Sequence, residues 1–63
     1  MASPVRFAVV KELLERHGWT FVRISSSHHV FEKPGDRDWS IPVHRNLVKG
    51  EYVRQIKKHL GER

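Results

Sequence analysis

Two adjacent histidines, His28 and His29, follow three serines and precede a hydrophobic pair in the segment SSSHHVF. A loop that only reversed the chain direction would favour Gly, Asn or Asp at such positions. An imidazole can accept or donate a proton near neutral pH, which makes histidine the side chain best suited to proton transfer in the cell. The segment therefore contains a candidate general acid–base residue.

The orientation of each histidine follows from strand alternation. The segment around Val30 and Phe31 has the residue types of a strand, and Phe31 is its strongest core candidate. Successive side chains of a strand point to opposite faces. We therefore expect His28 to face away from the core, and His29 to share the face of Phe31 and to pack or cap at the core margin.

A third histidine, His44, stands at the end of the next predicted strand. Two antiparallel registers are compatible with the pattern. In the first, Phe31 lies opposite Ile41 and the two histidines face each other directly. In the second, Phe31 lies opposite Trp39, and His28 faces the proline of that strand with His44 one diagonal step away. Either register places both histidines on the face away from the core.

Simpler interpretations of these histidines stay open on the residues alone. Solvated imidazoles at a strand end would need no function. Metal binding by His28, His29 and His44 is a third interpretation, but no local carboxylate or cysteine stands at metal-ligand spacing. Proton transfer, solvation and metal binding are thus the alternatives for this cluster.

Other side chains are candidates for contacts with a phosphate or a base. Ser27 is either an ordinary turn residue or a hydrogen-bond partner of a phosphate. Arg23 and Lys49 are either solvated charges or phosphate ligands. Trp19 and Trp39 have the chemistry to stack on bases, but their places within predicted strands favour core anchoring.

The first helix is predicted to begin at Ser3 and Pro4, an N-cap residue followed by the proline that suits the first helical position. Gly18 is a natural residue just past a helix end, so this helix should stop near His17. Apolar side chains with helical spacing form its core face: Phe7, Val10, Leu13 and Leu14.

Three strands are predicted next, over residues 19–24, 28–33 and 39–44. The serines at 25–27 form the first turn, and a Pro-Gly-Asp loop at 34–36 forms the second. The third strand alternates clearly between apolar and polar residues, but its proline removes a ladder hydrogen bond and indicates an edge strand or a bulge.

A second helix is predicted from Gly50 to Gly61, with Tyr52, Val53, Ile56 and Leu60 as its apolar face. The order of elements is then α-β-β-β-α. The predicted fold class is α+β: a two-layer sandwich in which both helices cover one face of a three-stranded antiparallel sheet. The opposite face of the sheet is left open to solvent, and it is where we expect the function to lie.

The chain has 63 residues, no cysteine and a net charge of +5. This length allows one domain, residues 1–63, with one small core. The longest apolar run is residues 7–10, far short of the roughly 20 residues that cross a bilayer, and no signal-peptide segment is recognisable. We expect a cytoplasmic protein without a membrane partner, and its positive charge makes nucleic acid the first partner to consider.

The chain resembles the HicA toxins of type II toxin–antitoxin modules from about Val10 to Gly61. That family commonly has a helix ending in HGW, a basic strand, GSHH before a hydrophobic residue, a proline turn, a P-x-H strand end and a K-G helix start. The corresponding segments here are HGWTFVRISSSHHVFEKP, IPVH, LVKG and YVRQIKKHLG.

The resemblance implies a double-stranded-RNA-binding-like fold and an mRNA interferase activity, with the histidine after Ser27, His28, as the catalytic residue. It also implies a cognate antitoxin protein that binds and covers the active face. The chain departs from the family pattern at Ser26, which replaces the usual glycine of this loop. A distorted loop would leave a protein that only binds RNA.

Our sequence-based hypothesis is a metal-independent endoribonuclease that uses the 2′-hydroxyl of the RNA as nucleophile and needs no cofactor. His28 is assigned the acid–base role and His44 a second proton transfer. Ser27 is assigned a hydrogen bond to the phosphate or the imidazole, and Arg23 and Lys49 supply positive charge. A non-catalytic RNA-binding module and a pure protein-interaction domain are the alternatives from other functional classes.

Overall fold

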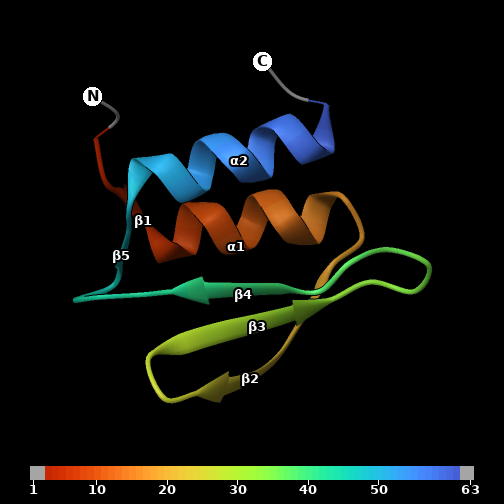
Figure 1. Cartoon of the computed structure of the whole chain (residues 1–63), viewed down its shortest axis with the longest axis horizontal. Helices are drawn as coiled ribbons and strands as arrows, with labels where there is room; N and C mark the ends of the chain where they lie inside the picture. The colour runs from red at the N-terminus through yellow and green to blue at the C-terminus, as the bar shows by residue number, and fades with distance from the viewer. Residues whose placement is uncertain (1–2, 62–63) are drawn as a thin grey trace.

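The computed structural model describes residues 3–61, so both ends of the predicted 1–63 domain lie outside the described residues. The protein is α+β, with two helices and a three-stranded antiparallel sheet of order β2-β3-β4. Figure 1 shows both helices on the same side of this sheet. In chain order the elements are β1 (Val5–Arg6), α1 (Phe7–Arg16), β2 (Thr20–Ser25), β3 (His28–Glu32), β4 (Trp39–Pro42), β5 (Leu47–Val48) and α2 (Gly50–Leu60).

The predicted start of the first helix is wrong. Helix α1 begins at Phe7, not at Ser3 and Pro4, and Val5 and Arg6 form β1 instead. Strand β1 pairs antiparallel with β5, where Val5 lies opposite the fully buried Val48. The preference of Ser3 and Pro4 for a helix start is a local effect. The burial and backbone pairing with β5, which is distant in sequence, outweigh it here. The predicted order α-β-β-β-α thus omits a short two-stranded sheet.

The three predicted strands are confirmed, with ends that shift by one or two residues. Strand β4 is an edge strand, as its proline indicated, and it ends at Pro42. The chain then turns through Arg45 and Asn46, which have φ of 53° and 63°. Positive φ at both central residues is the pattern of a type I′ hairpin turn. His44 and Leu47 close this turn through two backbone hydrogen bonds of 3.0 and 2.9 Å.

The register of β3 and β4 is the second of the two that the sequence allowed. Phe31 lies opposite Trp39, and His28 lies opposite Pro42. A bulge in β2 places Val22 as an extra residue between the pairs that Phe21 and Arg23 make with β3. Register and bulge together set which side chains of the sheet surround His28.

One hydrophobic cluster forms the core, and it holds both tryptophans, as predicted. Trp19 is 3% exposed and Trp39 is 5% exposed, so both are core anchors and not base-stacking platforms. The apolar faces predicted for the helices are the buried ones. Their fully or almost fully buried members are Val10, Leu13 and Leu14 of α1 and Val53 and Ile56 of α2.

Polar contacts join the end of α1 and the end of α2 to the loop between β3 and β4. The ammonium of Lys33 donates a 2.8 Å hydrogen bond to the carbonyl of His17 and lies 4.6 Å from the Trp19 ring centroid. Asp36 lies 2.9 Å from Nε2 of His59 and accepts a 2.7 Å hydrogen bond from the backbone N–H of Arg37. These contacts hold the loop between β3 and β4 against the C-terminal ends of both helices.

The hydrogen bond from the Arg37 N–H, followed by the one from His59, lowers the pKa of Asp36 from its ordinary value of 3.8. A carboxylate with a depressed folded-state pKa stabilises the fold above its unfolded-state pKa, and this contribution is lost as the pH falls through the folded-state value. We predict that Asp36→Asn, which keeps an acceptor for the Arg37 N–H, is less stable than the wild type at neutral pH. The difference should shrink below pH 3.8. Urea unfolding at several pH values measures it, and a difference that is independent of pH contradicts the assignment.

Candidate active-site cleft

A cleft of about 430 Å³ opens where β3 begins, β4 ends and α2 begins. It therefore lies at the strand ends and not on the middle of the open sheet face. We refer to it as the cleft. Its lining residues are Ser27, His28, Pro42, Val43, His44, Leu47, Lys49 and Tyr52.

Three local structures deliver the side chains of the cleft. The turn between β2 and β3 supplies Ser27, and His28 follows as the first residue of β3. The carbonyl of Ser27 accepts a 3.0 Å hydrogen bond from the N–H of Val43. The type I′ turn begins at His44 and returns the chain toward α2. Lys49 is the N-cap residue of α2, so its position is fixed by the start of that helix. Segments far apart in sequence thus meet at one place.

The turn before His28 keeps a backbone that glycine would favour, although Ser26 occupies it. Ser26 has a φ of 58°, while Ser27 is not among the residues with positive φ. Positive φ at only the first central residue of a two-residue hairpin is the pattern of a type II′ turn, which prefers glycine there. Ser26 therefore adopts a strained backbone conformation, and the loop keeps the turn type that glycine would favour. Ser25 still pairs with His28 across the turn.

The cleft offers proton carriers and positive charge. His28 and His44 are both exposed, and their imidazoles have no hydrogen-bond partner within residues 3–61. The ammonium of Lys49 is likewise unpaired in that part of the chain. No carboxylate is among the described residues that line the cleft. This set of groups suits a phosphodiester, whose cleavage requires proton transfer at the attacking and leaving oxygens and stabilisation of negative charge.

The structure brings together four of the five predicted site residues: Ser27, His28, His44 and Lys49. Arg23 is not one of the lining residues. It lies opposite Val30, farther along the sheet from the turn, and its guanidinium is 3.3 Å from the carboxylate of Glu32. The guanidinium of Arg23 therefore lies near Glu32 and does not add its charge to the lining of the cleft.

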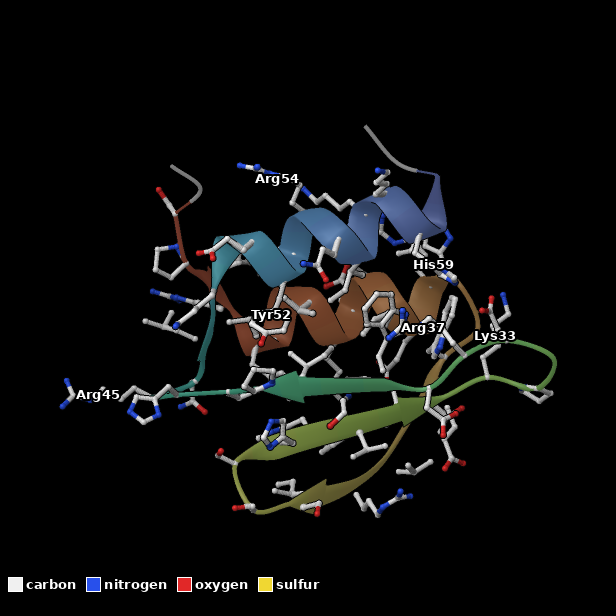
Figure 2. All side chains as sticks on the ribbon, viewed as in Figure 1. Lys33, Arg37, Arg45, Tyr52, Arg54 and His59 are labelled. Atoms are coloured by element: carbon white, nitrogen blue, oxygen red, sulfur yellow. The ribbon has the colours of Figure 1, made fainter. Side chains whose placement is uncertain are left out.

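Tyr52 is a lining residue that the sequence pattern did not assign to the site. Figure 2 shows its side chain extending from the first turn of α2 toward β4. Its ring packs against the core, as its place on the apolar face of α2 predicts, and its hydroxyl has no partner within residues 3–61. A tyrosine with an apolar body and a polar tip, close after Lys49, was the one sequence signal for this role.

His29 has a structural environment and lies on the core-facing side of β3, as predicted. Its ring lies 4.4 Å from the ring of Phe7 and 5.5 Å from that of Phe21, both measured between centroids. Its Nδ1 is buried without a hydrogen-bond partner. The two adjacent histidines therefore differ completely in environment, and only His28 is open to a ligand.

The comparison with protein families gives a match over most of the chain. A family model described as the HicA toxin of bacterial toxin–antitoxin systems matches residues 9–62. The chain belongs to the HicA toxin family. No curated protein and no solved structure matches it. Membership in this family makes the protein the toxin of a toxin–antitoxin pair and implies a cognate antitoxin as its partner.

Two further observations bear on this HicA family member. Among residues 3–61, no group of three or more His, Cys, Asp or Glu side chains is arranged to hold a metal ion. No helix in the described part of the chain is long and apolar enough to cross a membrane. The metal-binding interpretation of His28, His29 and His44 therefore gains no support, because His29 lies on the opposite face of the strand.

The strained turn of this HicA family member leads to a stability prediction. Ser26→Gly should raise the free energy of unfolding by about 1 kcal/mol, because glycine adopts a positive φ without steric cost. Chemical denaturation measures the change. The matched control is Ser27→Gly. Ser27 does not have a positive φ, so glycine relieves no strain there, and its greater loss of backbone entropy on folding should destabilise the variant. A destabilised Ser26→Gly protein would contradict the turn assignment.

Proposed function

We propose that this HicA toxin is a metal-independent endoribonuclease, an mRNA interferase, in which His28 is the general acid–base residue. The observation that supports this most strongly is the cleft itself. The exposed imidazole of His28 lines it together with His44 and Lys49, and no carboxylate lines it among the described residues. The double-stranded-RNA-binding-like fold expected of the family is part of the same proposal.

The proposed reaction is attack of the 2′-hydroxyl of the RNA on the adjacent phosphorus. The 2′-hydroxyl loses its proton to a base, the bond from phosphorus to the 5′-oxygen breaks, and the 5′-oxygen takes up a proton from an acid. The products are a 2′,3′-cyclic phosphate and a free 5′-hydroxyl. Two imidazoles near one phosphate can serve both proton transfers, so His28 and His44 are the proposed pair, with His28 indispensable.

Other residues of the cleft have supporting roles in the proposal. Lys49 stabilises the extra negative charge that develops on the phosphate. Ser27 donates a hydrogen bond to the phosphate or to the imidazole of His28. The unpartnered hydroxyl of Tyr52 is a further donor at the cleft wall. Arg23, which does not line the cleft, is proposed to contact RNA beyond the reacting phosphate.

The cognate antitoxin is proposed to cover the cleft. The chain carries a net charge of +5, and the cleft residues add no negative charge. A partner with acidic side chains over this region would be complementary and would exclude RNA by occupying the same donors. Such an interface is sensitive to salt, because its charges are exposed before binding.

We predict that His28→Ala lowers the RNA cleavage rate by ~10²–10⁴-fold and leaves the protein folded, because one general acid–base group typically supplies that factor. His29→Phe is the matched control. It replaces a ring packed between aromatic side chains and removes a buried unpartnered nitrogen, so it should stay folded and active. Purified protein, RNA and EDTA on a denaturing gel give the rates, and growth after induction gives the cellular effect.

The same assay separates the enzyme from a non-catalytic RNA-binding module. Both bind RNA with an affinity that falls as salt rises, but only the enzyme yields product. Intact RNA, under conditions where binding is measured, would favour the module. Full activity of His28→Ala would remove His28 from the proposed mechanism.

A further inference from the structure

A second pocket lies at the other end of β4, where the last turns of α2 pass the loop that leads into this strand. We refer to it as the distal pocket. Its volume is about 480 Å³. In Figure 2 the labelled side chains of Arg37 and His59 lie close together there, at the opposite end of β4 from Arg45. The lining residues are Arg37, Trp39, Gln55, Lys58 and His59.

The distal pocket is rich in hydrogen-bond donors. The guanidinium of Arg37 lies 4.2 Å from the ring centroid of Trp39, and its terminal nitrogens have no partner within residues 3–61. The side chains of Lys58 and Gln55 are unpaired in the same part of the chain. Trp39 is 5% exposed, and its indole N–H is buried without a hydrogen-bond partner. The exposed side chains of Lys58 and Gln55 and the terminal nitrogens of the exposed Arg37 lack an acceptor in this part of the chain, and an oxyanion would supply several.

The charged side chains that line the distal pocket are cationic. No carboxylate is among its lining residues. Asp36 stands next to it but is already engaged by His59 and by the backbone N–H of Arg37. Lys33, on the same loop, adds another cation near Asp36. A ligand in the pocket therefore meets Arg37 and Lys58 as available charges.

The cleft and the distal pocket share their two walls. On α2, Tyr52 lines the cleft, and Gln55, almost one helical turn later, lines the distal pocket. On β4, Pro42 lines the cleft and Trp39 lines the distal pocket. Three residues of strand correspond to ~10 Å. A strand of RNA that leaves the cleft along the seam between α2 and β4 reaches the distal pocket next.

We propose that the distal pocket binds a backbone phosphate of the same RNA strand whose scissile phosphate occupies the cleft. Arg37 and Lys58 are the charged contacts, and Gln55 is a neutral donor. This inference rests on the proposed function, since it requires that RNA enters the cleft. The affinity of the toxin for RNA then depends on the length and path of the strand. An RNA that spans both pockets binds more tightly than one that fills the cleft alone.

The test measures RNA binding by the His28→Ala chain, so that the RNA stays intact. The first variant adds Arg37→Gln and Lys58→Gln. The matched control adds Arg54→Gln and Lys57→Gln, which remove the same charge from exposed positions of the chain that do not line the pocket. Figure 2 shows Arg54 on the side of α2 away from the sheet. The probes are a single-stranded oligoribonucleotide that spans both pockets and a dinucleoside monophosphate.

We expect the first variant to bind the oligoribonucleotide about tenfold more weakly than the control does, because it loses the charge-assisted contacts of Arg37 and Lys58 to one phosphate. Its slope of log affinity against log salt should be smaller by ~0.7, the value for one phosphate on a single strand. Its affinity for the dinucleoside monophosphate should equal that of the control. Lys58→Gln alone should show part of the effect, which keeps the test valid if the loss of the Arg37 stacking contact unfolds the first variant.

Equal weakening in the first variant and the control would overturn the inference, because only net charge would then matter. Unchanged RNA binding together with weaker binding of the antitoxin would also overturn it and would assign the pocket to the protein partner. Absence of RNA binding by the His28→Ala chain would overturn it as well. Since cleavage is not measured, the result does not depend on whether His28 is the acid–base residue.

Discussion

The pairing of β3 with β4 is the constraint on which the rest of the structure depends. Phe31 is fully buried and lies opposite Trp39, which is 5% exposed. A slip of this register by one residue would turn the buried side chains of a strand to the opposite face, so burial of these two rings excludes such a slip. The position of His28 opposite Pro42 is a consequence of the same register.

The remaining parts of the cleft follow from how the chain continues beyond that register. The Val43–Ser27 hydrogen bond extends the contact of the two segments past the last strand pair, and the type I′ turn then sends the chain back at once. The fully buried Val48 anchors the returning segment in the core. Lys49 and α2 follow directly, so the first turn of the helix meets the strand ends. His28 thus begins a strand, Lys49 caps a helix, and His44 is held by two backbone hydrogen bonds to Leu47.

Much of this arrangement could be predicted from the sequence, because it depends on local patterns. Alternation around Phe31 predicted that His28 and His29 lie on opposite faces, and the amphipathic patterns gave the core faces of both helices. The choice between two registers could not be made, since both bury the same kinds of side chain. The β1–β5 pair was missed because each strand has only two residues and their pairing is long-range. The sequence did not assign Tyr52 to the cleft, and it did not show that Arg23 lies outside it, since both positions depend on segments distant in sequence.

The five histidines of the chain offer the most direct measurement of the central claim, which is that RNA binds with its reacting phosphate between His28 and His44. The protein can be titrated with a single-stranded RNA whose 2′-hydroxyl at the scissile position is replaced by hydrogen, while the imidazole signals are followed by NMR. We predict that the signals of His28 and His44 shift together with saturation of binding, and that the signal of His17, which lies outside both pockets, stays in place. Saturable binding of this RNA with no change at His28 would contradict the account.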